Sequence, residues 1–167
     1  MWFIQACTYC LLAFVCCCHH KEHKKPSINS TISKTVSWNS PVHLLNSLLS
    51  DPDFETENID EAFRSDLQFG DWKKDFPEQM MDCASNFSLD FGREVTADVF
   101  THWVQKSYDN SVFYIEHKMN ESNLKDSAII GMVNGLRVEQ LSVAVSWAHE
   151  ISDQSVRQQL LESLATQ

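Results

Sequence analysis

The chain has 167 residues, enough for one domain or at most two, and contains only four glycines and four prolines. So few glycines leave no glycine-rich phosphate loop and few tight turns, which argues against a dinucleotide fold or a β-sandwich and favours helices. A formal net charge of −10 disfavours nucleic acid as a partner, because phosphate binding requires clustered Lys and Arg side chains. No cofactor is expected.

Charge and cysteine are unevenly distributed along the chain. Residues 51–100 carry 14 acidic and four basic side chains, so the excess of negative charge lies in the middle third. Five of the six cysteines fall within the first 18 residues, and only Cys83 lies beyond them. Because a lone cysteine cannot form a disulfide within its own domain, we expect the body to be stable by packing alone and Cys83 to be a small buried residue.

Residues 1–18 form an N-terminal segment that is apolar and carries no charged side chain. As a helix, the run from Trp2 to Cys18 would be about 26 Å long, slightly short for a hydrocarbon core of about 30 Å. Three interpretations stay open: a cleaved signal that ends in a lipidated cysteine, an uncleaved anchor that is palmitoylated, or a plain secretory signal. The first resembles bacterial lipoproteins. The candidate lipidation sites are Cys16, Cys17 and Cys18.

The three interpretations predict different locations for the rest of the chain. A lipidated or cleaved signal places the body outside the membrane, in the cell envelope if the source is bacterial. An uncleaved anchor places it in the cytoplasm, because basic residues follow the apolar run and basic flanks stay on the cytoplasmic side. In either case we expect contact with a membrane through the N-terminus.

Residues 19–40 are polar and rich in Ser and Thr, which predicts a flexible linker. His19, His20 and His23 follow the cysteines and are weak candidates for metal ligands, since thiolate and imidazole bind Zn²⁺ and Cu⁺. Neighbouring residues make a poor tetrahedral chelate, so a basic flank at a membrane surface is the preferred interpretation.

Residues 41–84 are predicted to form an acidic helical segment. A leucine stripe indicates a helix over 41–50, Asn58 can cap a helix that begins at Ile59, and Pro77 suits the first turn of the next helix.

The carboxylates of residues 51–82 allow more than one function. A solvated acidic face is the preferred interpretation, and a docking strip for a basic partner is the second. Trp72, one of the spaced aromatic residues here, is then a candidate contact. A small hydrolase or a metal-handling envelope protein is a different class of function, but nothing in the spacing selects a pair of catalytic carboxylates.

Residues 85–167 repeat with a period near 32. Apolar side chains recur at Phe87, Met119 and Ile151 and again at Phe100, Met132 and Leu164, and basic side chains recur at Arg93, Lys125 and Arg157. A unit of this length accommodates two short helices with their turns, so the period predicts stacked helical hairpins. The basic triple is a candidate interaction surface; its alternative role is in caps and i,i+4 pairs.

Local signals predict where the helices of this half begin and end. We expect helices over 94–106, over 111–118 with Asp109 as cap, over 124–133 with Asn123 as cap, and from Asp153 to the last residues. Asn134 and Gly135 should end the third of these helices. Asp153 and Arg157 are spaced for an i,i+4 ion pair.

The run Trp147-Ala148-His149-Glu150-Ile151-Ser152-Asp153, followed by Arg157 and Leu160-Leu161, resembles a degenerate tandem helical repeat of uncharacterised bacterial secreted and lipid-anchored proteins. The repeat is loosely similar to tetratricopeptide and HEAT-type solenoids. The resemblance covers about residues 85–167 and departs from the pattern at Glu121 and at Gly131, which interrupts a helix. It implies an interaction scaffold and supplies no catalytic residues.

These observations predict an all-α body of short antiparallel helices stacked as hairpins, either a small solenoid or an irregular bundle. A signal or anchor and a flexible linker precede it. The expected function is non-enzymatic protein–protein interaction at or outside a membrane. The apolar face of the last helix predicts self-association or pairing with a partner.

Overall fold

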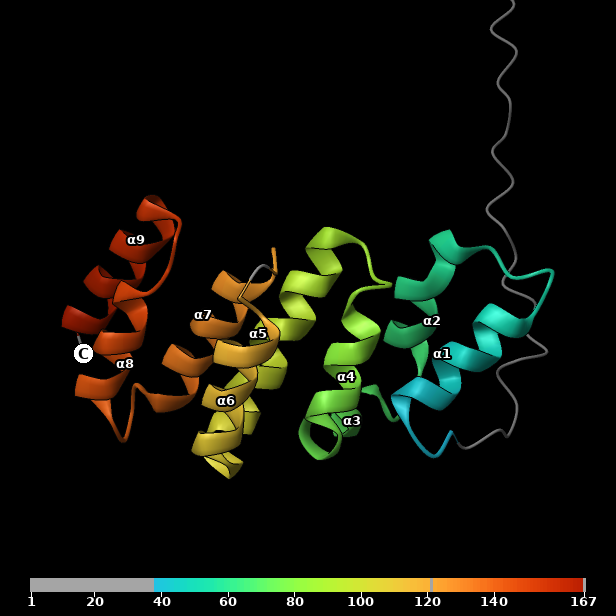
Figure 1. Cartoon of the computed structure of the whole chain (residues 1–167), viewed down its shortest axis with the longest axis horizontal. Helices are drawn as coiled ribbons and strands as arrows, with labels where there is room; N and C mark the ends of the chain where they lie inside the picture. The colour runs from blue at the N-terminus through green and yellow to red at the C-terminus, as the bar shows by residue number, and fades with distance from the viewer. Residues whose placement is uncertain (1–37, 121, 167) are drawn as a thin grey trace, which may run out of the picture. The chain divides into compact units, whose positions relative to one another are not determined.

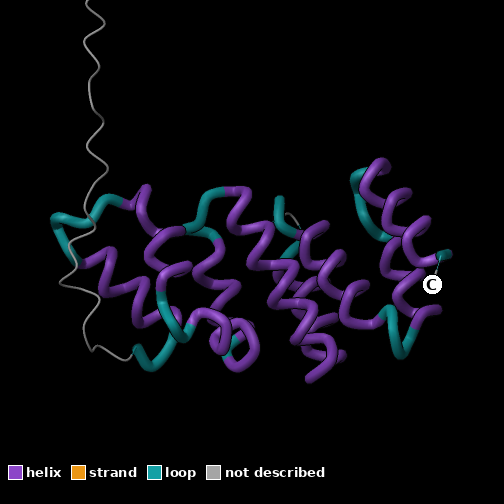
Figure 2. Tube along the Cα trace, turned by 180° about the vertical axis from the view of Figure 1, so that it is seen from behind, coloured by secondary structure: helices purple, strands orange, loops and turns teal. Residues whose placement is uncertain are grey.

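The computed structural model describes residues 38–120 and 122–166. This part of the chain contains nine α-helices, one short 3₁₀ helix and no strand (Figures 1 and 2). The all-α prediction is therefore confirmed for these residues. The N-terminal segment, most of the linker, the candidate lipidation sites and the candidate metal ligands His19, His20 and His23 lie outside the described residues.

The elements follow one another with short connections. In chain order they are α1 Pro41–Ser50, η1 Thr56–Asn58, α2 Ile59–Ser65, α3 Phe69–Asp75, α4 Pro77–Ala84, α5 Leu89–Lys106, α6 Tyr108–Lys118, α7 Lys125–Leu136, α8 Leu141–His149 and α9 Gln154–Ala165. In the described part of the chain, no helix is both long and apolar enough to span a membrane.

The helix pair α5–α7 is the most extensive contact of the body. Two glycines of α7 allow the two helices to approach closely. A Cβ atom at Gly131 would lie 2.3 Å from the Ala97 carbonyl oxygen, and one at Gly135 would lie 2.3 Å from Cγ1 of Val104. The absence of a side chain at these positions lets the two backbones approach.

Two predictions for this region are therefore wrong. Gly131 does not interrupt a helix and Asn134-Gly135 does not end one, because α7 continues through both glycines to Leu136. Tertiary packing against α5 outweighs the low helix propensity of glycine, which costs only about 1 kcal/mol per residue.

Serine and aspartate side chains cap several helices. The Ser40 hydroxyl accepts from His43 N–H before α1, and the Ser88 hydroxyl accepts from Phe91 N–H before α5. As a result α5 begins at Leu89, five residues before its predicted start. Asp153 caps α9 as predicted, with its carboxylate accepting from Ser155 and Val156 N–H at 2.9 and 3.1 Å.

Three other predicted caps are wrong. The side chain of Asn58 makes no capping hydrogen bond to α2. Asp109 falls within the first turn of α6, because that helix begins at Tyr108. Before α7, the Leu124 N–H donates to the Ser122 hydroxyl at 3.1 Å, so the turn is fixed without the side chain of Asn123.

The predicted ion pair between Asp153 and Arg157 is also absent from the ion pairs of residues 38–120 and 122–166. The Asp153 carboxylate is occupied by the backbone N–H groups of α9. The Arg157 guanidinium instead donates to the Ile151 carbonyl oxygen at 2.8 Å.

The positions that recur every 32 residues occupy matching places. Phe87, Met119 and Ile151 follow α4, α6 and α8, and each is at most 9% exposed. Their counterparts Phe100, Met132 and Leu164 are buried on α5, α7 and α9. The pairs α4–α5, α6–α7 and α8–α9 thus share one order of helix, buried apolar residue and helix.

Candidate functional site

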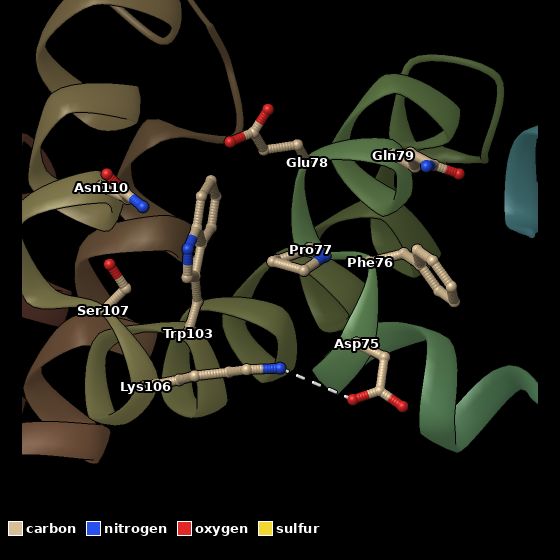
Figure 3. A pocket seen from close by; sticks show the side chains of 9 residues that line it. All are labelled: Asp75, Phe76, Pro77, Glu78, Gln79, Trp103, Lys106, Ser107 and Asn110. Carbon is tan, nitrogen blue, oxygen red and sulfur yellow. Dashed lines mark ion pairs between the residues drawn. The ribbon is translucent and has the colours of Figure 1, made fainter.

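Two grooves open between helices of the body. The first, here called the α4–α6 groove, has a volume of about 370 Å³. Figure 3 shows Trp103 standing between α4 and α6 with Pro77 opposite it, and Glu78 and Asn110 at the edge. Lys106 pairs with Asp75 at 3.6 Å, so these two charges already satisfy each other.

The second groove, the α6–α8 groove, is larger, with a volume of about 490 Å³. Its walls are α6 and α8, and its floor is α7. Its lining residues are Tyr108, Val112, Ile115, Glu116, Asn120, Lys125, Ile129, Val143, Ser146, Trp147 and Glu150.

The sequence spacing explains why these side chains converge. On α8 and the residue after it, the lining positions 143, 146, 147 and 150 follow the i, i+3, i+4, i+7 pattern of one helix face. On α6 the positions 108, 112, 115 and 116 follow the related i, i+4, i+7, i+8 pattern. Ile129 of α7 is fully buried beneath them. Trp147 Nε1–H donates to the Tyr108 hydroxyl at 3.2 Å and ties the two walls together.

Three charged side chains line the α6–α8 groove. They are Glu116 on α6, Glu150 directly after α8, and Lys125 at the start of α7. None of the three takes part in an ion pair of the described residues. The groove therefore combines an apolar floor with charges that are available to a ligand.

The three basic candidates have different surroundings. Arg93 is exposed on α5, Lys125 lines the α6–α8 groove, and Arg157 is held on α9 by the Ile151 carbonyl oxygen. Of the three, Lys125 is the one that lines either of the two grooves described above. Arg157 fits the alternative role given for the basic triple, because its guanidinium binds a backbone carbonyl oxygen in the turn before α9.

Trp72 is not available as a surface contact. Its side chain is only 3% exposed, and its ring packs edge-on against Phe63 with centroids 6.3 Å apart. The prediction of Trp72 as an interaction residue is wrong, because the ring completes the apolar core beneath the acidic segment.

Several carboxylates of residues 51–82 bind the backbone nearby. Asp51 accepts from Asp53 N–H at 3.0 Å, Asp66 accepts from Gln68 N–H at 2.8 Å, and Asp60 accepts from Ser88 N–H at 3.1 Å. Within the described ranges, no three His, Cys, Asp or Glu side chains lie close enough to hold a metal ion.

Two ionisable groups, the buried Cys83 thiol and the partly buried Tyr114 hydroxyl, have strongly shifted pKa values. Burial, reinforced by the Asp82 carboxylate, raises the pKa of the Cys83 thiol to about 12. Burial, together with Asp82 and Glu78, also raises the pKa of Tyr114 to about 12. Because the thiolate is the reactive form of cysteine, Cys83 stays protonated and inert at neutral pH and is a core residue.

Comparison with known proteins adds no family to this description, since no family model, no curated protein and no solved structure matches the chain. The groove residues were the part that the sequence left unassigned. Three of them, Val112, Val143 and Trp147, are partly buried in the structure. The available signal was the helical spacing of apolar and acidic residues on two neighbouring helices.

Proposed function

We propose that the helical body is a non-enzymatic protein–protein interaction module, carried on a chain whose N-terminal segment tethers it to a membrane or directs it across one. The observation that carries the proposal is the α6–α8 groove. Its apolar side chains lie between two helices, and they are surrounded by three charged side chains that form no ion pair with any residue of 38–120 or 122–166. An apolar surface rimmed by polar groups is typical of an interaction site.

We further propose that the body consists of degenerate tandem helical hairpins, similar to tetratricopeptide or HEAT-type repeats. The matching order of α4–α5, α6–α7 and α8–α9, with a buried apolar residue after each first helix, supports this proposal. Both grooves open between successive first helices, α4 with α6 and α6 with α8. Stacks of this kind bind partner segments along such surfaces.

Two features favour binding over catalysis. The Cys83 thiol is buried and protonated, and carboxylates such as Asp60 and Asp66 are committed to backbone N–H groups. A general acid and base pair requires two carboxyl groups in contrasting environments. Asp60 and Asp66 instead fix backbone N–H groups, at the start of α5 and in the turn before α3.

Site-directed photo-crosslinking tests the interaction function. A photo-reactive phenylalanine analogue replaces Ser146, an exposed residue of the α6–α8 groove, in the full-length chain in its own cells. A matched variant carries the analogue at Ser163, an exposed position on α9 that lines neither groove. We expect covalent complexes with another protein from position 146 and none from position 163. Equal crosslinking from both positions, or none from either, would overturn the proposal.

The tether is tested separately by the intact mass of the protein recovered from membranes. A chain that begins at Cys16, Cys17 or Cys18 and carries added acyl mass identifies a lipoprotein. A complete chain of 167 residues identifies an uncleaved anchor. Recovery of a shortened, unmodified chain from the soluble fraction identifies a plain secretory signal.

A further inference from the structure

We infer that the α6–α8 groove binds a basic amphipathic peptide segment, whose apolar side chains enter the groove while its Lys or Arg side chains pair with Glu116 and Glu150. The inference rests on the proposed interaction function and specifies the chemistry of the partner. Three observations carry it: the shape of the groove, its fixed geometry, and its charges.

The shape of the groove fits one amphipathic segment. Each wall presents a single helix face, with Val112 and Ile115 on α6 and Val143 and Trp147 on α8, and Ile129 closes the floor. A segment with apolar residues at helical spacing can fill such a slot with one stripe of side chains. Its opposite face then stays in water.

The floor of the groove and the Trp147 ring are held in place before any partner arrives. The hydrogen bond from Trp147 Nε1–H to the Tyr108 hydroxyl sets the Trp147 ring. The floor helix α7 is held against α5 at Gly131 and Gly135. A groove that is already ordered loses little conformational entropy on binding, so a short peptide can bind it.

The charges of the groove select a basic segment. Glu116 and Glu150 are both exposed, and neither forms an ion pair in the part of the chain that the structure describes. Residues 38–167 carry 22 acidic and nine basic side chains, so the field of the body attracts a cationic partner over a longer range. Lys125 repels a cation at its own position and thereby sets the register of the peptide.

A second copy of this chain is a poorer occupant of the groove. Two bodies that each carry an excess of 13 acidic side chains repel one another at low ionic strength. The same excess disfavours an acidic peptide. A basic segment is the occupant whose charge is complementary to both the rim and the body.

Three synthetic peptides test the inference against the full-length chain held in a neutral detergent. Each peptide is 14 residues long and has Leu and Ala on one helical face. The other face carries Lys in the first peptide, Gln in the second and Glu in the third. Fluorescence anisotropy of the labelled peptides gives each Kd. The anisotropy of each peptide with detergent micelles alone is measured as the blank. We expect the Lys peptide to bind about tenfold more tightly than the Gln peptide, and more salt to narrow the difference.

Groove variants locate the binding. We expect E116Q/E150Q to weaken the Lys peptide about fivefold, and S146R, which fills the groove with a cation, to weaken it at least about tenfold. The matched control E139Q/E162Q removes the same charge from exposed positions that do not line the groove and should leave the Kd within about twofold. Circular dichroism of each variant checks that the fold is retained.

The outcomes separate this inference from the proposed function. Equal binding of the Gln and Lys peptides, or equal weakening by E139Q/E162Q and E116Q/E150Q, overturns the basic partner. If crosslinks from position 146 still form in cells, the interaction function stands and the partner has another chemistry. If S146R converts a dimer to a monomer without changing the peptide Kd, a second copy occupies the groove and the inference is wrong.

Discussion

The middle of the helical body and its C-terminal end are held together by different interactions. At α5–α7, the buried side chains of Phe100 and Val104 lie against Gly131 and Gly135, which bring the two backbones together. The α8–α9 end buries few side chains fully, namely Ala144, Ala148, Ile151 and Leu164. It depends on polar contacts to backbone groups. The floor of the α6–α8 groove thus belongs to the close-packed middle, and one wall belongs to the polar end.

The polar contacts at the C-terminal end converge on one turn. The Asp126 carboxylate of α7 accepts from Ser152 N–H at 2.9 Å and from Asp153 N–H at 3.0 Å. Arg157 of α9 donates to the Ile151 carbonyl oxygen in the same turn. Because these bonds are partly in contact with water, we expect the end to open locally more often than the middle.

The largest expected effect on stability comes from a substitution that disrupts the close packing of α5 and α7. In G131A the new methyl group would lie 2.3 Å from the Ala97 carbonyl oxygen and 2.7 Å from the Phe100 Cβ atom. Because the first of these is backbone, α5 and α7 must move apart, and we expect a loss of about 3 kcal/mol or more in the free energy of unfolding. Urea unfolding followed by circular dichroism measures it.

G70A is the matched control for that variant. Gly70 lies on α3, and a Cβ atom there would meet nothing within 4 Å. We expect G70A to be neutral or to stabilise by about 0.5 to 1 kcal/mol, because alanine is the better helix former. An equal loss in G70A and G131A would show that the close approach of α5 and α7 is not the cause of the loss.

The next effect concerns the polar end. In D126A the N–H groups of Ser152 and Asp153 lose their acceptor, and we expect a loss of about 2 kcal/mol. Hydrogen exchange should speed up in α9 and stay unchanged in α5. The control D109A removes a carboxylate from the first turn of α6 and should cost only about 0.5 kcal/mol. Faster exchange over the whole body in D126A would contradict a separable end.

A third effect is seen only at high pH and concerns the buried thiol of Cys83 on α4. The unfolded chain loses the Cys83 proton near its ordinary pKa of 9.0, whereas the folded chain retains it up to a pKa of about 12. Stability from this group is complete below pH 9 and falls as the pH rises toward 12, by up to about 1.4 kcal/mol per unit. In C83A we expect the loss between pH 8 and pH 10 to be smaller by about 1 kcal/mol. Urea unfolding at both pH values measures the difference, and an unchanged loss would show that other groups cause it.

Much of the fold could be predicted because many of its signals are local. The leucine stripe of 41–50, Pro77 and Asp153 each act within one or two turns of chain, and α1, α4 and α9 begin where these residues indicate. Gly131 and Gly135 were misread because their role is set by the facing backbone of α5. The spacing of residues along the chain does not indicate that the backbones of α5 and α7 approach each other closely.

The candidate site was less predictable for the same reason. The floor and walls of the α6–α8 groove come from three helices, and residues such as Val112, Ile129 and Val143 each look like ordinary packing residues in their own segment. Of the lining residues, the sequence indicates only Lys125 as a candidate interaction residue, because it belongs to the basic triple that recurs every 32 residues. Trp72 is the opposite case. Its place in an acidic stretch predicts an exposed contact residue, but its ring lies in the apolar core.

The smallest effect compares two caps that the sequence presents as equals. Asp153 accepts two N–H groups at the start of α9, so D153A should cost about 1 kcal/mol. Asn123 precedes α7 without a side-chain cap, and the turn there is held by the Ser122 hydroxyl, so N123A should leave the free energy of unfolding unchanged. Urea unfolding of both variants measures the difference. Equal losses would mean that Asn123 caps α7 in solution, and that the start of this helix depends on polar contacts in the way the start of α9 does.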